Sequence, residues 1–391
     1  MALGVYFHIP YCLQRCTYCD FATYEFSKIL PPKDYVQLVL AEMNQKAKYY
    51  QPRLLDTIYF GGGTPSLIDP QLILALIQGL EKLGFKTRPN TEMTIEINPA
   101  TINEDKLKQY LDFGINRFSV GAQTFDNQLL KMVNREHNAQ QTLETLELLA
   151  KHGLNFSFDI LFALPHQTFA GLQKDVDIAI QQGASHISPY CLTVPSGHPL
   201  SKNRPPEDEQ VDMFDFIREQ LVKNGFAQYE ISNFSKPGFE SRHNLLYWTD
   251  QEYWGLGLSA HSYLKNSAYG TRFWNLNNIQ NYQDQIRHFE EKIFSSPDQH
   301  LPQDQFEILE KHQALTDFCY TSLRTSQGLD LIHLKNKFDQ ATADLVIQVL
   351  KNQIHNDYIK WHNHSVLLTD AGNIASNLVF EKLTFLKSDL S

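Results

Sequence analysis

Short apolar runs alternate with amphipathic stretches along the first half of the chain. The runs have the length of strands, and the stretches between them repeat apolar residues at intervals of three and four, as helices packed on one face do. The predicted strands span residues 3–9, 57–60, 92–97, 116–120, 155–160 and 186–190, and the predicted helices span 33–49, 70–83, 104–113, 139–151 and 169–181. This alternation predicts an α/β protein with a parallel sheet and right-handed crossover helices. Six repeats favour a partial (β/α)6 barrel over a closed barrel of eight strands.

The pattern changes in the second half of the chain. Prolines between residues 195 and 206 interrupt it, and the segment 225–264 is dense in aromatic residues and histidines. Helices are predicted at 207–223, 304–323, 329–337, 341–352 and 370–383, and strands at 358–361 and 365–368. Helices followed by a two-stranded wing predict a winged-helix-like terminal domain. We therefore predict three domains: the barrel over 1–205, an α+β extension over 206–300 and the winged-helix-like domain over 301–391.

Composition narrows the class of protein. Hydrophobic residues make up 42% and charged residues 20% of the chain, as in an ordinary globular protein. The net charge of −10 argues against a nucleic-acid backbone as a general partner, and the mixed charge of residues 330–337 favours a packing or substrate-covering role for the terminal domain. We expect no membrane span and no signal peptide, because long apolar runs and a charged leader are absent. A cytoplasmic location follows as an expectation.

Three of the five cysteines, Cys12, Cys16 and Cys19, lie in one C-x-x-x-C-x-x-C loop directly after the first predicted strand. Such a loop can direct three sulfurs to one point, and thiolates favour iron–sulfur clusters or zinc. A structural zinc site needs a fourth protein ligand, and the next cysteine, Cys191, is far along the chain, whereas a [4Fe–4S] cluster tolerates one iron without a protein ligand. Zinc or a redox thiol cluster remains the alternative at this point. We expect Cys191 and Cys319 to be ordinary buried small residues.

Polar residues and glycines follow the predicted strands one after another. Ligands of such sheets lie at the carboxyl ends of the strands, where this chain places Gly62, Gly63, Thr64, Glu96, Gln123, Arg135 and Asp159. Glycines let the backbone approach a ligand, so that its N–H groups can bind a carboxylate or its carbonyls can hold an amino group. A guanidinium can hold a carboxylate in a forked pair. Each residue alone is more readily structural. Their recurrence after successive strands predicts a ligand site.

The cysteine motif, with Tyr18 before its last cysteine, resembles the signature of the radical S-adenosylmethionine (SAM) superfamily. That resemblance implies a [4Fe–4S] cluster whose open iron is chelated by SAM, and cleavage of SAM to a 5′-deoxyadenosyl radical. The run Gly61-Gly62-Gly63-Thr64-Pro65 resembles the oxygen-independent coproporphyrinogen oxidase (HemN-like) family. By this resemblance, SAM would be contacted by Tyr6, Tyr18, Gly62, Gly63, Thr64, Glu96, Gln123, Arg135 and Asp159. His8 shares the side of the first strand on which Tyr6 lies.

Two related families differ at a few positions. Coproporphyrinogen oxidases extend the motif to C-x-x-x-C-x-x-C-x-C after a longer N-terminal stretch, whereas here Phe21 takes the last position and eleven residues precede Cys12. Cys19-Asp20-Phe21 and the run 243–248, which reads HNLLYW, resemble instead the HemW-type heme chaperones. This resemblance implies a protein that binds a [4Fe–4S] cluster, SAM and heme and delivers heme to heme-accepting proteins such as respiratory enzymes. His243 would be the heme-binding residue.

Other functions stay open at the level of the sequence. A radical SAM oxidase would decarboxylate propionates of coproporphyrinogen III to give protoporphyrinogen IX, and an iron–sulfur regulatory protein would bind no porphyrin. The aromatic segment 225–264 could line a porphyrin site or form a plain core. The sequence does not decide whether SAM is cleaved or only bound, and so whether the protein is an enzyme. It also leaves open which proteins accept heme and whether the chain forms a homodimer.

Overall fold

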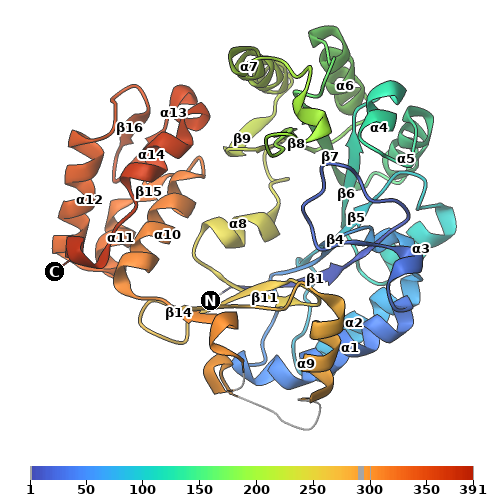
Figure 1. Cartoon of the computed structure of the whole chain (residues 1–391), viewed down its shortest axis with the longest axis horizontal. Helices are drawn as coiled ribbons and strands as arrows, with labels where there is room; N and C mark the ends of the chain where they lie inside the picture. Colours follow the sequence, from blue (N-terminus) through green and yellow to red (C-terminus); the bar gives the residue numbers. More distant parts are fainter. Residues whose placement is uncertain (1, 289–294, 300, 391) are drawn as a thin grey trace.

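Six parallel strands form the centre of the sheet in the computed structural model, which describes residues 2–288, 295–299 and 301–390. In spatial order they are β1 (Leu3–Ile9), β4 (Thr57–Gly62), β5 (Glu92–Ile97), β6 (Arg117–Gln123), β7 (Asn155–Phe162) and β8 (His186–Cys191). The crossover helices α1 (Pro32–Lys46), α2 (Pro70–Lys82), α3 (Glu104–Asp112), α5 (Ala139–Lys151) and α6 (Phe169–Gln181) cover the outer face of these strands (Figure 1). The predicted partial (β/α)6 barrel is confirmed.

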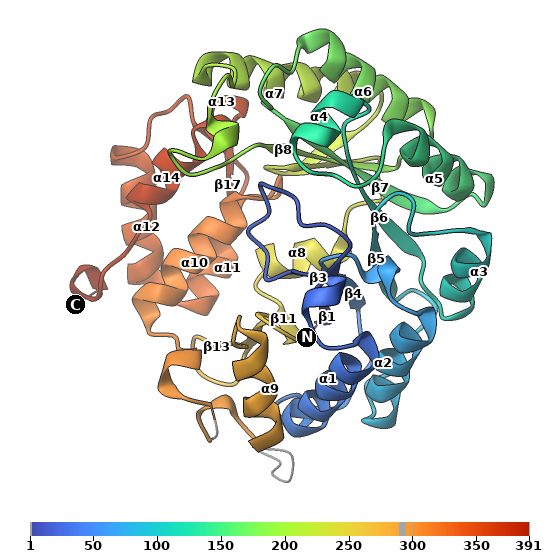
Figure 2. The ribbon, with the colours of Figure 1, turned by 45° about the vertical axis from the view of Figure 1, so that its right-hand side comes forward.

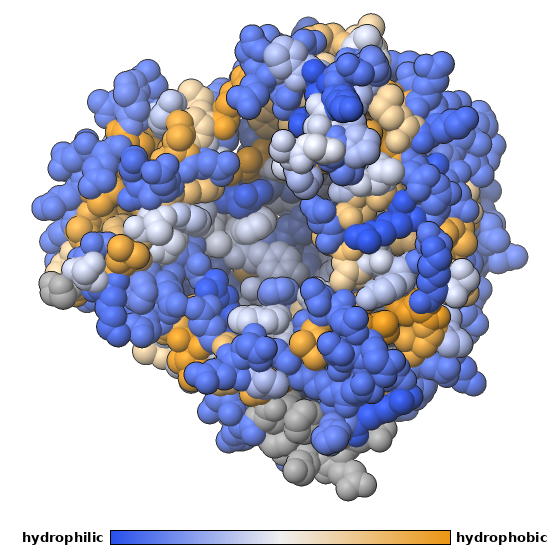
Figure 3. Space-filling view, viewed as in Figure 1, coloured by the Kyte–Doolittle hydropathy of each residue, from blue (hydrophilic) through white to orange (hydrophobic). Residues whose placement is uncertain are grey.

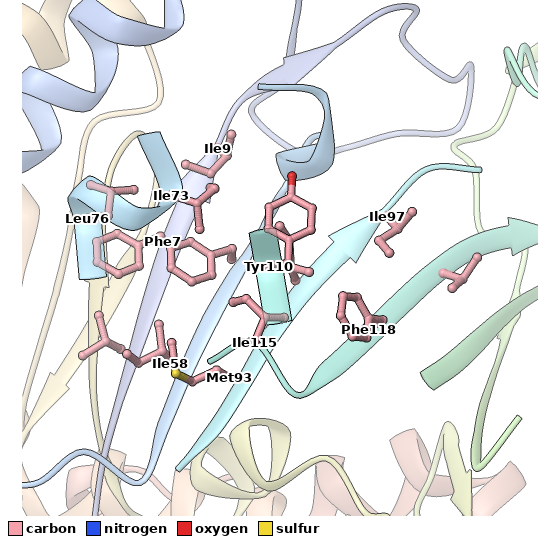
Figure 4. Close-up of a cluster of buried hydrophobic side chains, with 14 of the residues drawn as sticks. Phe7, Ile9, Ile58, Ile73, Leu76, Met93, Ile97, Tyr110, Ile115 and Phe118 are labelled. Carbon is pink, nitrogen blue, oxygen red and sulfur yellow. The ribbon is translucent and has the colours of Figure 1, made fainter. Parts of the chain in front are cut away.

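The outer face of the barrel strands is apolar and the inner face is polar. In β1, for example, Val5, Phe7 and Ile9 are fully buried against the helices, whereas Tyr6 and His8 point to the inside. Figure 4 shows Phe7, Ile58 and Phe118 packed with side chains of α2 and α3, such as Ile73 and Tyr110, in the main hydrophobic core. Each such side chain contributes about 1.5–3 kcal/mol by burial. Strands buried on both faces are usually apolar throughout, so a polar interior indicates a ligand site.

The sheet continues beyond both edges of the barrel. Next to β8 lie the antiparallel strands β10 (Asn233–Ser235) and β9 (Ala227–Glu230). Next to β1 lie β11 (Glu252–Leu256), which is parallel to it, and then antiparallel β12 (His261–Leu264), β13 (Thr271–Trp274) and β14 (Phe306–Ile308). The division at 205/206 stays a prediction, and residue 300, at the second predicted boundary, lies outside the described residues.

One predicted helix was wrong over its first turns. Residues 304–310 were expected to begin the helix 304–323, but Phe306–Ile308 form the edge strand β14, which pairs with β13. The helix α10 starts only at Lys311 (Lys311–Leu323). Pairing with a strand distant in sequence decided the conformation of this short segment, and no local pattern reports such pairing.

The chain ends in a lobe with the predicted winged-helix order. After α10 come β15 (Leu329–Asp330), α11 (Leu331–Lys337), α12 (Gln340–Asn352), β16 (Ile359–His362) and β17 (Ser365–Leu368), followed by α13 (Asp370–Ile374) and α14 (Ser376–Lys382). The three strands pair in the order β15-β17-β16, and the lobe has its own apolar cluster. The two-residue strand β15 was not predicted.

Within the described residues, no helix is long and apolar enough to cross a membrane.

Three further helices complete the connections. They are α4 (Asn127–Met132), α7 (Glu207–Lys223) and α9 (Ile279–His288). A fourth, α8 (Arg242–Trp248), lies between the barrel and the C-terminal lobe in Figure 1. Its Leu246 and His243 side chains reach Gly4 of β1 so closely that a Cβ on this glycine would lie 2.4 and 3.2 Å from them. Helix α8 therefore packs inside the barrel, directly against β1 at Gly4.

Candidate functional site

A cavity of about 440 Å³ opens inside the barrel at the carboxyl ends of the strands. We call it the cysteine cavity. Of the predicted site residues it is lined by Cys12, Cys16, Cys19, Tyr18, Gly62, Gly63, Thr64, Glu96, Gln123, Arg135 and Asp159. Tyr6 and His243 do not line it. The structure thus brings together the residues that the sequence places after successive strands, as the topology of a parallel sheet requires.

The cysteine loop is held over the mouth of the barrel by contacts with distant segments. The Thr17 amide donates to the Val133 carbonyl (3.2 Å), and the Thr17 carbonyl lies 3.1 Å from Nε2 of His198. The Asn134 amide group donates to the Arg15 carbonyl (2.8 Å). At the base of the loop, the short strands β2 (Tyr11–Cys12) and β3 (Tyr24–Glu25) pair in parallel. Figure 2 shows this N-terminal segment crossing in front of α8.

The three thiols suit an iron–sulfur cluster with one open position. They lie on one wall of the cavity, and burial raises the pKa of Cys12 to about 11, so that iron would have to displace its proton. A guanidinium N–H of Arg135 lies 3.4 Å from Sγ of Cys16 and would stabilise a thiolate there. Among the described residues, no three His, Cys, Asp or Glu side chains are grouped as ligands of a single metal ion. A bound cluster and SAM would supply one-electron chemistry at this wall.

The structure leaves open one of the two predicted uses of the glycine loop, the one through its carbonyl oxygens. The N–H of Gly62 donates to Oε2 of Glu96 (3.0 Å), and those of Gly63 and Thr64 donate to the carbonyls of Ile9 (2.9 Å) and Tyr11 (2.7 Å). These N–H groups are therefore not available to a ligand, and carbonyl oxygens would have to hold its amino group. Glycine is required here because Gly62 has φ +110° and a Cβ would lie 2.6 Å from the His8 ring.

Glu96 lies at the centre of the inner wall. Its Oε1 accepts from the Tyr59 hydroxyl (2.9 Å), and burial raises the pKa of its carboxyl group to about 7. Burial likewise raises the pKa of Asp159 to about 6. Near neutral pH both groups therefore exchange protons readily, and an added ligand with hydroxyl groups could hydrogen-bond to either form.

At the end of β6 the backbone is strained where Gln123 enters the cavity. Gln123 has φ +69°, and the register between β6 and β7 shifts at this point. The nearby Arg135 donates to Oδ1 of Asn98 (3.2 Å) and to the Gly121 carbonyl. Asn98 also contacts Nδ1 of His137 (2.7 Å), so that a chain of polar contacts fixes the guanidinium. Asn98 lines the cavity and was not predicted as a site residue.

Arg117 is a second residue that the sequence analysis missed. It is 2% exposed, lines the cavity, and its Nε has no hydrogen-bond partner among the described residues. Its charge acts to lower the pKa of both Asp159 and Glu96, against the larger effect of burial. The signal was present in the sequence, because Arg117, Ser119, Gly121 and Gln123 alternate with apolar residues and so share the inner face of β6.

One cysteine prediction was wrong. Cys319 is fully buried as expected, but Cys191 is exposed and lines the cysteine cavity. Its Sγ lies 3.4 Å from Oε1 of Gln210 and 3.9 Å from a guanidinium nitrogen of Arg204. The position at the carboxyl end of β8 explains this, since that edge of the sheet faces the cavity.

A second cavity of about 600 Å³ adjoins the first. We call it the aromatic cavity. It is lined by aromatic rings of the barrel, of the extension and of the C-terminal lobe, namely Tyr6, Phe21, Tyr247, Trp248, Tyr253, Tyr263, Tyr269 and Phe318. Phe21 lines both cavities, and the rings of Tyr6 and Tyr59, whose centroids are 6.0 Å apart, form the wall between the cavities. Figure 3 shows the molecule hollowed between the barrel and the C-terminal lobe.

Side chains of helix α8 line both cavities. Its Asn244 lines the cysteine cavity, and its Tyr247 and Trp248 line the aromatic cavity. The buried Glu92 carboxylate holds the start of the helix by accepting from the N–H groups of Arg242 and His243 (both 2.9 Å). The run HNLLYW, which the sequence marks as one motif, thus supplies side chains to two neighbouring sites.

His243 itself lies within the wall. It is 1% exposed, with Nδ1 2.6 Å from Oγ1 of Thr57 and Nε2 2.9 Å from the Tyr247 hydroxyl. Burial lowers the pKa of its imidazole to about 3, so it is neutral. Tyr6 lies in the same wall, with its ring centroid 6.4 Å from that of His243, and its hydroxyl contacts Nδ1 of His8 (3.1 Å). The roles of Tyr6 and His243 stay predictions.

Comparison with known proteins agrees with this architecture. Residues 6–179 match the model of the radical SAM superfamily. The chain is 32% identical over 398 residues to the heme chaperone HemW of Lactococcus lactis, covering 99% of this chain and 98% of that protein. It is 33% identical to the heme chaperone HemW of Bacillus subtilis, over 96% and 98% of the two chains.

Among solved structures, coproporphyrinogen III oxidase (HemN) from Escherichia coli, a radical SAM enzyme, has the same fold. It superposes with a TM-score of 0.81 at 18% identity, covering 98% of this chain and 90% of that one. A radical SAM protein binds a [4Fe–4S] cluster and SAM, which the donors of the cysteine cavity fit. The chain belongs to the HemW family of the radical SAM superfamily.

Proposed function

We propose that this protein is a heme chaperone, which holds heme beside a [4Fe–4S] cluster and SAM and transfers it to heme-accepting proteins. The match to relatives named heme chaperone HemW carries this proposal, because it extends over 98% of their length and so includes both cavities. The structure supports it by placing an aromatic cavity of about 600 Å³ next to the cysteine cavity. Volumes of this order accommodate one organic ligand.

In this proposal each group of predicted residues has one role. The thiolates of Cys12, Cys16 and Cys19 bind the cluster. The residues that hold SAM are Tyr18, Gly62, Gly63, Thr64, Glu96, Gln123, Arg135 and Asp159, which line the cysteine cavity, and Tyr6, which would act from the wall between the two cavities. Arg135 is suited to the SAM carboxylate, because contacts with Asn98 and Gly121 already fix its guanidinium group.

Heme transfer is the decisive measurement. The protein, reconstituted anaerobically with iron and sulfide, is titrated with heme with and without SAM, and the Soret band is recorded. The loaded protein is then mixed with the heme-free form of a respiratory cytochrome. We expect stoichiometric binding followed by appearance of the spectrum of the cytochrome. Absence of heme binding, or binding without transfer, contradicts the proposal.

The same preparation tests the oxidase function. Incubation with SAM, a reductant and coproporphyrinogen III should leave the porphyrinogen unchanged, since Phe21 occupies the position of the fourth cysteine of the oxidase motif. Formation of protoporphyrinogen IX would overturn the choice of chaperone over oxidase.

We further place the protein in the cytoplasm, because the three free thiols of the cluster loop need a reducing compartment.

A further inference from the structure

The histidines that reach the aromatic cavity differ in whether their ring nitrogens are occupied. His8 is 4% exposed, with Nδ1 at 3.1 Å from the Tyr6 hydroxyl and Nε2 at 2.9 Å from the Ala22 carbonyl. His261, at the start of β12, is exposed to the cavity, and neither of its ring nitrogens has a hydrogen-bond partner in the described part of the chain. An imidazole with a free nitrogen is the usual protein ligand of heme iron.

The backbone before His261 is rigidly held. The turn between β11 and β12 receives contacts from α1, where Glu42 accepts from the Gly257 N–H (2.8 Å) and the Tyr35 hydroxyl accepts from the Leu258 N–H (2.9 Å). On its other side, the Ala260 carbonyl accepts from the Asn275 N–H (3.0 Å). The base of the His261 side chain is thus fixed before any ligand arrives, which lowers the entropic cost of binding.

The imidazole of His261 is also oriented and neutral. Its ring stacks on Trp274, with the centroids 5.9 Å apart and the planes at 25°. Burial and the nearby charge of Arg272 lower its pKa, which keeps a lone pair on the ring at neutral pH. One face of the ring is covered and its edge is free.

We propose that heme binds in the aromatic cavity with His261 as its axial ligand. This inference rests on the proposed chaperone function and assigns it a site. The rings of the cavity pack against the apolar face and edges of the macrocycle. The wall formed by Tyr6 and Tyr59 then separates the heme from the cysteine cavity, so that the heme edge and the SAM site are neighbours.

His243 has a different role in this arrangement. Its Nε2 meets the Tyr247 hydroxyl at 2.9 Å, and the ring of Tyr247 lies 4.7 Å from that of Tyr253 in the cavity lining. His243 is therefore a positioning residue, which fixes the aromatic wall of α8 without reaching the iron. Coordination by His243 would require breaking its contacts with both Thr57 and Tyr247 and moving it out of the barrel.

The ion pairs made by the charged residues that line the aromatic cavity explain how heme bound there is released. Lys337 pairs with Asp250 (2.6 Å), and Arg272 pairs with Glu307 (2.7 Å) and Asp317 (2.9 Å). Because both cations of the lining are engaged, the propionates extend from the mouth into water instead of being locked in ion pairs. Heme is then held by apolar contacts and one axial bond, which suits cargo that has to be passed on.

The test compares three alanine variants of the full chain by heme titration. His261→Ala should lose the histidine-ligated spectrum and at least about tenfold in heme affinity. His243→Ala should keep the ligation spectrum of the parent, and so should His355→Ala, a control on the exposed surface of the C-terminal lobe. Iron–sulfur absorbance and SAM binding should persist in His261→Ala, because the cysteine cavity lies elsewhere.

Rescue by free imidazole separates ligation from folding. In His261→Gly, imidazole added to the solution should restore the spectrum by occupying the space of the lost ring. An unchanged spectrum in His261→Ala, or a loss in His261→Gly that imidazole does not repair, overturns the assignment. Loss of ligation in His243→Ala alone would assign the iron to His243 instead. Failure of the parent protein itself to bind heme would refute the chaperone function rather than this ligand.

Discussion

Replacing Glu96 by Gln should make the stability of the protein less sensitive to pH. The carboxyl group of Glu96 accepts from Tyr59 and from the Gly62 N–H, and burial raises its pKa from the ordinary value of 4.5 to about 7. The folded state therefore binds this proton more tightly than the unfolded chain does. Stability is highest where both states are protonated and falls as pH rises from the unfolded towards the folded pKa.

The size of the effect follows from these two pKa values. A shift of the pKa from 4.5 to about 7 lowers the free energy of unfolding by roughly 2.5 kcal/mol as the pH rises from about 5 to about 8. Glutamine has no charge to bury, but its amide can accept only one of the two hydrogen bonds, which costs about 1–3 kcal/mol at all pH values. Glu96→Gln should thus be less stable than the parent at the lower pH and similar to it at the higher pH.

The assay is thermal unfolding of the apo-protein in reducing buffer at the two pH values. The melting temperature of Glu96→Gln relative to the parent should rise by about 5 °C from the lower to the higher pH. Glu147→Gln removes the same charge from the exposed side of α5 and serves as the control. A difference between Glu96→Gln and the parent that does not change with pH would refute the reasoning that burial perturbs this carboxyl group.

Three further predictions concern the cluster loop, the glycine loop and the guanidinium. Serine at Cys12, Cys16 or Cys19 should abolish iron and acid-labile sulfide after anaerobic reconstitution, whereas serine at Cys191 should retain both; a cluster that needs Cys191 contradicts the three-cysteine assignment. Gly62→Ala should lower stability by about 1–3 kcal/mol and weaken SAM binding, because its φ of +110° and the His8 ring leave no room for a Cβ. Gly171→Ala in α6 should instead be neutral or slightly stabilising, and equal melting temperatures of the two variants would refute this account. Arg135→Lys should weaken SAM binding measured by calorimetry, since lysine cannot bridge Asn98, Gly121 and a carboxylate together; unchanged affinity would exclude Arg135 from the site.

The sequence by itself determined the barrel and most of the residues of the cysteine cavity. Apolar runs of strand length located the six parallel strands, and a periodicity of about 3.6 located their helices, because each helix buries one face against the same core. Once the strands are parallel, their carboxyl ends meet at one edge, so that residues as distant as Cys12 and Asp159 had to line one cavity.

Other features depend on contacts between segments distant in sequence, and only the tertiary structure decided these. It turned residues 306–308 from helix into an edge strand, since that outcome depends on pairing with β13, which is distant in sequence. It also separated the residues of HNLLYW, because one helix wedged between two cavities presents different sides to each, burying His243 between them. A free imidazole at His261 could not be recognised from the sequence, since the occupancy of a ring nitrogen depends on which atoms the fold brings within hydrogen-bonding distance.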